Sequence, residues 1–439
     1  MEDEKSRDTL LFLYISCKLI AWERKKGDVR VEHFITQINI KELLHLSNIQ
    51  INLNEEKRQH LLITGKNGSG KTSLLLAIQK YIKAINDGRL SEILKEYPDI
   101  IKITQDKLKR ARSESERYEW QKKYESFLSV VKRYSDGVET VFNYFENLDS
   151  LYEKGDFVTA FFPADRKTKL QHVNGVEEVK LAEKYSVDAD PGSVLLKYMV
   201  HLKTQQSYAR NEGDTVNAER IQKWFDRFED ALRILLDDST IRLEFDYRQY
   251  NFMIHQQGKK PFSLEQLSDG YSSVIYMLAD LILRMDKNWL LGDKLSRYDT
   301  EGVVLIDELE THLHIELQKK ILPFLTEFFP RIQFIVTTHS PYILNSISNA
   351  KAYDLEKQRE LENLSAFSSE ELAEAYFDAD EYSEDIKRKL SQYEYLKRKK
   401  ELTDDERAER ARLRSELKNL SGEFSGAIKD KFEELERKE

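Results

Sequence analysis

The chain has a single cysteine, few long apolar runs and no excess of basic residues. Each of these features excludes a class of protein. Cys17 is the only cysteine, so the chain can form no internal disulfide and no cysteine-rich zinc site. A single cysteine is typical of the reducing cytosol, where we expect this protein. The apolar run from Leu10 to Ile20 follows acidic residues, contains Lys18 and is too short to span a bilayer. We interpret it as a buried strand, and we expect a soluble protein with no membrane partner.

Acidic residues outnumber basic ones, and the formal net charge is −9. This balance argues against a chain that is basic throughout, although it allows a local basic strip that binds nucleic acid. Charged residues make up 33% of the chain and hydrophobic residues 40%, which favours a globular core carrying long, solvated helices. The 439 residues suffice for about two or three domains, with no internal repeat and no low-complexity linker.

A phosphate-binding loop lies at Gly65 to Thr72, where the chain reads GKNGSGKT, an unbroken G-x-x-x-x-G-K-[ST]. The loop follows HLLIT, which predicts a strand buried on both faces, and precedes KTSLLLAIQKYIKAI, which predicts a helix. Its backbone N–H groups and the helix N-terminus form a site for phosphate. Lys71 would reach the β- and γ-phosphates, and the Thr72 hydroxyl is placed for Mg²⁺. The other loop residues expected to bind nucleotide are Gly65, Asn67, Gly68, Ser69, Gly70 and Ser73.

Two carboxylates follow a second apolar strand, 303–306. At the end of a core strand beside a phosphate-binding loop, Asp307 can hold the Mg²⁺ shell. Glu308, directly after it, can orient and deprotonate the attacking water. His339 ends the apolar FIVTTHS strand and could hydrogen-bond the γ-phosphate. A lone histidine at such a place is usually structural, but its order in the chain after the two carboxylates favours the catalytic interpretation.

A pair of histidines, His312 and His314, precedes the next predicted helix. The two could bind a metal. No cysteine or third nearby histidine completes such a site, so a structural role is favoured.

The stretch LSDGYSS, Leu267 to Ser273, would be interpreted as a turn before a helix if it stood alone. A helix N-terminus that carries Ser268, Asp269 and Gly270 is also an anion site. The chain already has a phosphate cradle far upstream. Two such sites acting on one nucleotide fit a head-to-tail pair of subunits.

Two polar segments are expected to be helical. From about Asn86 to Glu153, apolar residues recur at alternating four- and three-residue spacing. The spacing indicates either a short coiled-coil or helical-hairpin seam, or an amphipathic helix packed on its own domain. A second helical block is expected at 192–237, followed by a strand pair and a turn near Gly258. The seam consists of Trp120, Tyr124, Phe127, Val131 and Tyr134.

After about Asn345 the chain becomes dense in Lys, Arg and Glu. Capping boxes at Ser368–Glu371 and Thr403–Glu406 mark two helix starts. Two apolar stripes predict a helical appendage that packs on the body or on a partner, or else a solvated helical hairpin with no partner. One stripe contains Ile386, Leu390, Tyr393 and Leu396, and the other contains Leu413, Leu417 and Leu420.

Four of these segments, GKNGSGKT, LSDGYSS, VVLIDELETHLH and FIVTTHSP, resemble in this order the Walker A, signature, Walker B/D-loop and H-loop segments of ABC-type ATPases. The likeness is to the soluble SMC, RecF and OLD branch. DELETHLH and TTHSP look especially like the AAA-type ATPases of bacterial phage-defence operons, such as those of Septu, retron and PARIS systems. The resemblance covers about 34–345. It implies an α/β fold: a P-loop ABC-ATPase head, with a mixed sheet flanked by helices, helical insertions and a helical C-terminal appendage.

The resemblance also implies a division of the chain. We expect the first part of the head at 1–85, a helical or short coiled-coil insertion at 86–153, and a strand and Q-loop region at 154–191. A second helical insertion at 192–237 precedes the C-terminal lobe at 238–350 and the charged appendage at 351–439. The first insertion is far too short for a full SMC-type arm. The tail lacks the acidic pattern of the TOPRIM nuclease domain of OLD proteins, so we expect no nuclease in this chain.

Residue roles follow from the same resemblance. Lys71 and Thr72 would contact phosphate and Mg²⁺, Asp307 would support Mg²⁺, Glu308 would be the base and His339 the γ-phosphate switch. Ser268, Asp269 and Gly270 would close over the ATP of a partner subunit. The Q-loop glutamine, a further metal-shell ligand, is assigned to Gln171, although PADRKT precedes it and Arg166 could replace it.

The function implied is an ATP-hydrolysing switch in antiviral defence, using ATP and Mg²⁺ as a homodimer or higher homo-oligomer. It would control an effector encoded alongside, a nuclease or a toxin. The alternative is a RecF-like DNA-repair ATPase, with DNA bound by the basic strips 107–110, 166–169 and the lysines near Lys122. A third possibility, a scaffold that binds ATP without turnover, is disfavoured by the intact Glu308.

Overall fold

The computed structural model describes residues 32–135, 137–166, 173–291, 298–361, 364, 368, 371–372, 384–399 and 401–423. The strand expected from Leu10 to Ile20, together with Cys17 and Gln171, lies outside these residues. Within them, every helix is too short or too polar to cross a membrane.

A six-stranded sheet forms the centre of the molecule, in the order β12-β11-β3-β10-β9-β5. Its strands pair in parallel except for β12, which is antiparallel to β11. Every residue of β3, β9 and β10 is buried, as expected for central parallel strands covered on both faces. The strands are β3 (His60–Thr64), β5 (Phe157–Phe162), β9 (Glu301–Ile306), β10 (Ile332–Thr337), β11 (Ala350–Asp354) and β12 (Arg359–Leu361).

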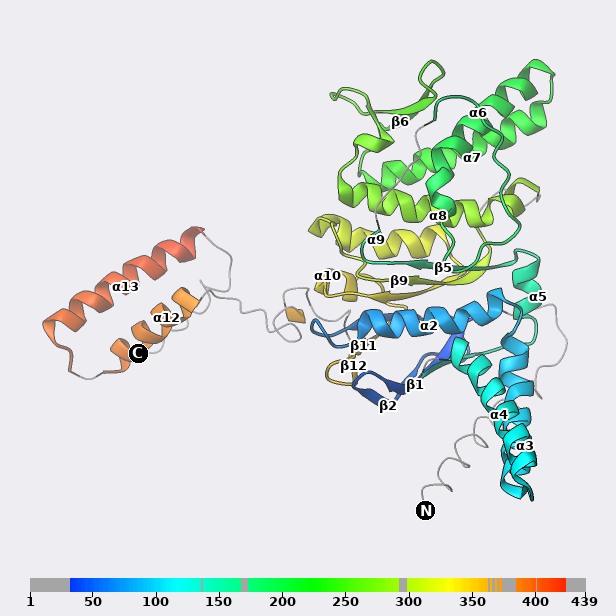
Figure 1. The fold of residues 1–439 in the computed structure, drawn as a ribbon. Helices are drawn as coiled ribbons and strands as arrows, with labels where there is room; N and C mark the ends of the chain where they lie inside the picture. The colour runs from blue at the N-terminus through cyan, green and yellow to red at the C-terminus, as the bar shows by residue number, and fades with distance from the viewer. Residues whose placement is uncertain are drawn as a thin grey trace.

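Two layers cover this sheet, because alternate residues of each strand point to opposite faces. Leu61 and Ile63 of β3 enter a core with α2 (Lys71–Asn86), whereas Leu62 enters the core on the other side. That second core is built on α8 (Asp269–Leu291) and α9 (Ile315–Phe328) (Figure 1). The expected fold class, a mixed α/β head flanked by helices, is confirmed.

A small antiparallel sheet, in the order β2-β1-β4, lies on the α2 side. Its first two strands are β1 (Ile35–Leu43) and β2 (Leu46–Asn52). β4 (Val138–Phe142) corrects the prediction, because 86–153 is not helical throughout. Its residues Val138, Thr140 and Phe142 are buried alternately, but the helical pattern on either side obscured this short strand.

The first insertion is a helical hairpin of α3 (Tyr97–Arg110) and α4 (Glu114–Tyr134), preceded by a π-helical turn, Glu92–Glu96, and followed by β4 and α5 (Leu148–Glu153). The ring of Phe127 lies 5.8 Å from that of Tyr97, so part of the seam faces α3. Tyr134 is buried in the core of the head. The seam therefore fits both interpretations: part of it packs within the helical hairpin, and part of it packs on the head.

The second helical block is confirmed as α6 (Leu195–Asn211) and α7 (Thr215–Leu235), after a 3-10 turn, Pro191–Val194. The expected strand pair is β6 (Arg242–Asp246) and β7 (Asn251–His255), which β8 (Phe262–Ser263) extends before a second 3-10 turn, Leu264–Gln266. This small sheet leads directly into α8.

The C-terminal region begins as sheet, not as a helical appendage. After α10 (Pro341–Leu344), β11 pairs with the strand that carries the phosphate-binding loop, so 350–361 belongs to the head and not to an appendage starting at 351. The segment AKAYD gave no strand signal by itself, because its place in the sheet depends on β3.

Beyond the sheet, α12 (Glu384–Arg398) and α13 (Asp404–Glu423) form a hairpin with a core of its own, apart from the head (Figure 1). Both predicted capping boxes are present, with side chain and backbone bonded in each direction. The two apolar stripes pack on each other, which agrees with the solvated-hairpin interpretation. Its core contains Leu390, Tyr393, Leu396, Leu413 and Leu417, while the side chain of Leu420 lies outside the described residues.

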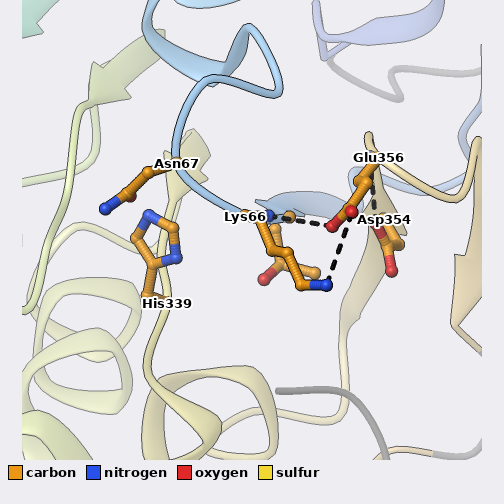
Figure 2. A pocket seen from close by; sticks show the side chains of 7 residues that line it. Lys66, Asn67, His339, Asp354 and Glu356 are labelled. Carbon is orange, nitrogen blue, oxygen red and sulfur yellow. Dashed lines mark hydrogen bonds and ion pairs between the residues drawn. The ribbon is translucent and has the colours of Figure 1, made fainter. Parts of the chain in front are cut away.

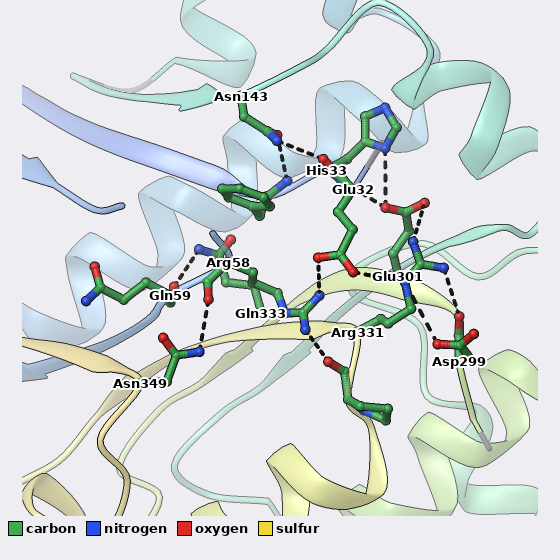
Figure 3. Close-up of polar contacts among 12 residues, drawn as sticks. Glu32, His33, Arg58, Gln59, Asn143, Asp299, Glu301, Arg331, Gln333 and Asn349 are labelled. Carbon is green, nitrogen blue, oxygen red and sulfur yellow. Dashed lines mark hydrogen bonds and ion pairs between the residues drawn. The ribbon is translucent and has the colours of Figure 1, made fainter. Parts of the chain in front are cut away.

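A polar network ties the small sheet to the N-terminal edge of the main sheet (Figure 3). Glu301 accepts a 2.8 Å hydrogen bond from the backbone N–H of His33 and pairs with Arg331 at 3.4 Å. The amide of Gln333 bonds both the N–H and the carbonyl of Ile35, at 2.7 and 2.8 Å. The candidate site lies at the opposite edge of the main sheet, where the strands end.

Candidate active site

The phosphate-binding loop joins β3 to α2, and its backbone fits glycine where the sequence has it. Gly65, Gly68 and Gly70 all have positive φ, at 137, 84 and 95°. A Cβ on Gly65 would lie 2.9 Å from the Ser69 hydroxyl, so the loop also needs glycine there for space. The Ser69 hydroxyl is buried and has no hydrogen-bond partner within the described residues.

The side chain of Lys71 lies inside this loop. Its ammonium donates hydrogen bonds to the carbonyls of Gly65 at 2.7 Å and Lys66 at 3.1 Å. Burial lowers the pKa of Lys71, while the nearby carboxylates of Glu308 and Glu310 oppose this shift. The lysine therefore sits at the centre of the loop with acidic groups around it.

The loop and the acidic strand end meet through a chain of hydrogen bonds. The Thr72 hydroxyl donates to Asp307 Oδ2 at 2.9 Å, and the Thr337 hydroxyl donates to Asp307 Oδ1 at 2.5 Å. The backbone N–H of Glu308 donates to the same Thr337 hydroxyl at 2.7 Å. Three segments distant in sequence therefore place Thr72, Asp307 and Glu308 in one site.

Glu308 adopts a backbone conformation that is uncommon for a residue with a side chain, with φ at 44°. Its carboxylate is half-buried and lies 3.4 Å from the Thr311 hydroxyl. Strained backbone of this kind persists only where the surroundings hold it.

His339 lies two residues after β10 and lines the pocket next to Asn67 (Figure 2). Its backbone N–H donates to Glu310 Oε1 at 2.5 Å. Its Nε2 is buried and has no hydrogen-bond partner in the described part of the chain. Burial, reinforced by the charge of Lys71, lowers the pKa of His339, which keeps the ring neutral at neutral pH.

Two acidic residues that the sequence did not suggest also line this pocket. Asp354 ends β11, and Glu356 follows it, accepting a 3.3 Å hydrogen bond from the backbone N–H of Lys66 (Figure 2). They reach the loop because β11 pairs with β3, and no spacing or motif signals that pairing. The pocket is lined by Thr64, Gly65, Lys66, Asn67, His339, Asp354 and Glu356.

The LSDGYSS segment lies on the other layer, at the start of α8. Ser268 and Asp269 are exposed, and among the described residues no hydrogen bond or ion pair joins them to the phosphate-binding loop of the same chain. Gly270 is buried, and a Cβ there would lie 2.4 Å from the carbonyl oxygen of His312. Packing within one chain therefore requires glycine at this position, independently of any role in nucleotide binding.

The histidine pair, His312 and His314, lies just before α9. Across the described residues, no group of three or more His, Cys, Asp or Glu could hold a metal ion. His312 has positive φ, at 64°, and presents its carbonyl to Gly270, while His314 directly precedes α9. The structural interpretation of these histidines agrees with this arrangement.

Arg166, the alternative to Gln171, does not point to a metal role. The guanidinium bonds the Ser273 hydroxyl and four backbone carbonyls, those of Pro163, Asp307, Glu308 and Leu309. A guanidinium has about five N–H donors, so these contacts use them all. The idea that Arg166 replaces a Q-loop glutamine stays a prediction.

Comparison with known proteins finds one matching family model and, over shorter stretches, similarity to proteins of defence systems. The profile of the family described as "AAA domain, putative AbiEii toxin, Type IV TA system" matches residues 61–345. The chain is 34% identical over 129 residues to the Septu protein PtuA of Bacillus mycoides (strain KBAB4), covering 29% of this chain and 17% of that protein. It is 37% identical over 97 residues to the "Retron Ec83 probable ATPase" of Escherichia coli, covering 22% and 18%.

These two matches span less than a fifth of each relative's own length. Among solved structures, the chain is similar to the SMC head bound to the C-winged helix domain of ScpA, with a TM-score of 0.41 and 15% identity. That match covers 76% of this chain and 100% of the other.

Proposed function

The chain belongs to the AAA-domain family whose profile covers residues 61–345, and from that membership we propose an ATP-hydrolysing switch of bacterial antiviral defence. Two copies would pair head to tail with ATP between them, in the cytosol. Nucleotide binding and hydrolysis would control a partner effector, a nuclease or a toxin. The names of the relatives, a Septu protein and a retron ATPase, support the defence setting.

The hydrogen-bond chain from Thr72 through Asp307 and Thr337 to Glu308 carries this proposal. Nucleotide hydrolysis needs a phosphate cradle, a metal-binding oxygen set and a base within one small volume. The chain supplies the cradle from one segment and the carboxylates from another, and the hydroxyls hold them together. A glycine-rich turn without catalytic purpose would not require this convergence.

The residues present fit a magnesium ion. Mg²⁺ binds hard oxygen ligands and takes one or two from protein, with phosphates and water completing its shell. The Thr72 hydroxyl and the Asp307 carboxylate are such ligands, 2.9 Å apart. When bound there, the ion would neutralise charge on the phosphates.

The remaining side chains would act on the phosphates and the water. Lys71 would exchange the loop carbonyls that it now contacts for phosphate oxygens. Phosphate is the stronger hydrogen-bond partner because it carries negative charge. The neutral ring of His339 would present its unpartnered Nε2 to the γ-phosphate. Glu308 would orient the attacking water and accept its proton.

Pairing between copies is proposed because the start of α8 is separate from the loop of its own chain. Ser268 and Asp269 are exposed at a helix N-terminus, where backbone N–H groups and the helix dipole favour an anion. In a head-to-tail pair, this end would face the ATP held by the other copy. ATP would then join two surfaces that are incomplete when separate.

A Glu308→Gln variant tests the function. It should bind ATP with Mg²⁺ but hydrolyse it about 100- to 10,000-fold more slowly than the wild type, as expected when a general base is lost. Light scattering should show a larger mass with ATP than without. Glu316→Gln, an exposed change at the start of α9, is the matched control and should behave as the wild type. If the wild type shows no ATP hydrolysis and the variant shows no ATP-dependent mass change, the proposal of an ATP-dependent switch is wrong.

The DNA-repair alternative depends on the basic strips, and two of their lysines are already engaged. Lys107 and Lys123 lie over the ring of Trp120, at 4.4 and 4.6 Å from its centre. The Lys107 contact joins α3 to α4, whereas the Lys123 contact lies within α4. Salt-dependent DNA affinity remains the test of that alternative, with a linear fall of log affinity against log salt as its signature.

A further inference from the structure

Arg166 is buried and links two parts of the molecule. Its side chain is 7% exposed. Its Nε donates to the Ser273 hydroxyl on α8 at 2.9 Å. Its two other nitrogens donate to the carbonyls of Asp307 at 2.6 Å, Glu308 at 3.0 Å and Leu309 at 3.1 Å, in the turn after β9. One planar group therefore joins the second turn of α8 to the backbone of the acidic turn.

The acidic turn is held from both sides. Thr337 accepts the N–H of Glu308, and Arg166 donates to the Glu308 carbonyl. Between these two contacts, Glu308 keeps its uncommon φ of 44°. The backbone of Glu308 is thus held by groups on two other segments, and one of them, Arg166, is also bonded to α8.

A second contact, made by the backbone alone, also joins the start of α8 to the acidic turn. Gly270 lies against the carbonyl of His312, four positions after Glu308, at a distance that leaves no room for a Cβ. The start of α8 and the acidic turn therefore touch at Gly270 and are bonded through Ser273. A shift of the α8 N-terminus cannot leave the turn unaffected.

We propose that Arg166 is a positioning residue that couples the N-terminus of α8 to the orientation of Glu308. This rests on the proposed function, in which α8 faces ATP held by a second copy. Contact of Ser268 and Asp269 with that ATP would then be transmitted through Ser273 and Arg166 to the base of the same chain. Each copy would hydrolyse its own ATP efficiently only while its α8 is engaged.

Ser273→Ala tests the coupling most directly, because it removes the bond to α8 and leaves the four carbonyl contacts. We expect kcat to fall about tenfold or more, since a buried guanidinium N–H loses its partner. KM for ATP, and the ATP-dependent mass measured with Glu308→Gln added, should stay within about twofold of their parent values. Thr204→Ala removes a half-buried hydroxyl that bonds only its own helix in α6, and it should leave kcat unchanged.

Arg166→Lys is the second variant, because a lysine cannot serve all the acceptors. It should lower kcat by more than Ser273→Ala does. Adding Ser273→Ala to it should cause no further loss, since both changes break the same connection. Multiplicative losses in the double variant would overturn the proposal. Should Arg166→Lys not fold, the kcat and KM of Ser273→Ala decide alone.

The outcomes separate this inference from the proposed function. If the wild type hydrolyses ATP and Ser273→Ala keeps its kcat, the coupling is wrong and the switch stands. If Ser273→Ala lowers the melting temperature and the affinity for ATP together with kcat, the role of Arg166 is structural only. If the wild type does not hydrolyse ATP at all, the proposed function itself has failed.

Discussion

The hydroxyl of Thr72 donates a 2.9 Å hydrogen bond to the carboxylate of Asp307, although 235 positions separate them in the sequence. The first follows a glycine-rich loop and the second ends a buried strand. Neither pattern by itself says that the two will meet. Their contact turns two separate motifs into one site, and the following predictions examine what surrounds it.

Ser268→Arg should separate nucleotide binding from hydrolysis. The residue is exposed at the start of α8, so a large charged side chain there leaves the fold and the phosphate-binding loop intact. It should obstruct the second copy and lower hydrolysis about 100-fold or more, the scale seen when a donor to developing charge is lost. Equilibrium binding of a fluorescent ATP analogue and a phosphate-release assay measure the two effects.

A control for this change is Ser207→Arg, at an exposed position of α6. It should alter neither measurement. Normal hydrolysis by Ser268→Arg would show that LSDGYSS is only a turn before a helix.

Gly270→Ala should destabilise the fold itself. Its Cβ would lie 2.4 Å from the His312 carbonyl, so the backbone of one segment must move, at a cost of about 1–3 kcal/mol. Gly175→Ala is the matched control, since no atom lies within 4 Å of the added Cβ. Urea unfolding of both variants measures the difference. Equal stability of the two would mean that this close approach is not rigid.

Glu301→Gln should reveal an acid-sensitive contact. Burial would raise the pKa of Glu301, but the hydrogen bonds from His33 and the charge of Arg331 outweigh it, and the pKa is lowered. A lowered folded pKa stabilises the protein above the ordinary value of 4.5, and the contribution is lost as the pH falls through the folded pKa. At pH 7 the variant should be less stable by about 1–3 kcal/mol.

The pH profile gives this prediction its control. The stability difference between Glu301→Gln and the wild type should shrink as the pH falls below 4.5. Chemical denaturation at several pH values measures it. A difference that is constant with pH would point to packing instead of charge.

Leu417→Ala should loosen the C-terminal hairpin alone. Leu417 is fully buried in the small core between α12 and α13. Removing it leaves a cavity that typically costs about 2–5 kcal/mol, more than such a small core can lose. Hydrogen exchange in both helices should rise, while ATP hydrolysis by the head stays unchanged. Tyr395→Ala, at an exposed position of α12, should leave exchange as in the wild type.

The sequence allowed most of the head to be predicted, because its central strands carry strong local signals. HLLIT, VVLI and IQFIVT are rich in apolar residues, and a residue of the site follows each within two positions. The phosphate-binding loop has a spacing that few other structures share. The arrangement of these strands, with β3 between β10 and β11, follows from none of these signals.

What could not be predicted depends on contacts between distant segments. β11 is a five-residue strand with lysine and aspartate in it, and only its pairing with β3 makes it a strand. Asp354 and Glu356 reach the pocket for that reason alone. Arg166 could be identified as unusual near the Q-loop position, but four of its five acceptors are backbone carbonyls, which no residue pattern reveals.

The central position of β3 has a consequence for how the chain is made. Leu61 pairs with Ile335 on one side and with Lys351 on the other, and both partners are synthesised long after it. At about 5–20 residues per second, the ribosome needs on the order of tens of seconds to reach them. During that time the apolar segment HLLIT has both edges open and no sheet to join. The nascent protein therefore depends on slow, late strand pairing, and protection by a chaperone during synthesis should raise its yield.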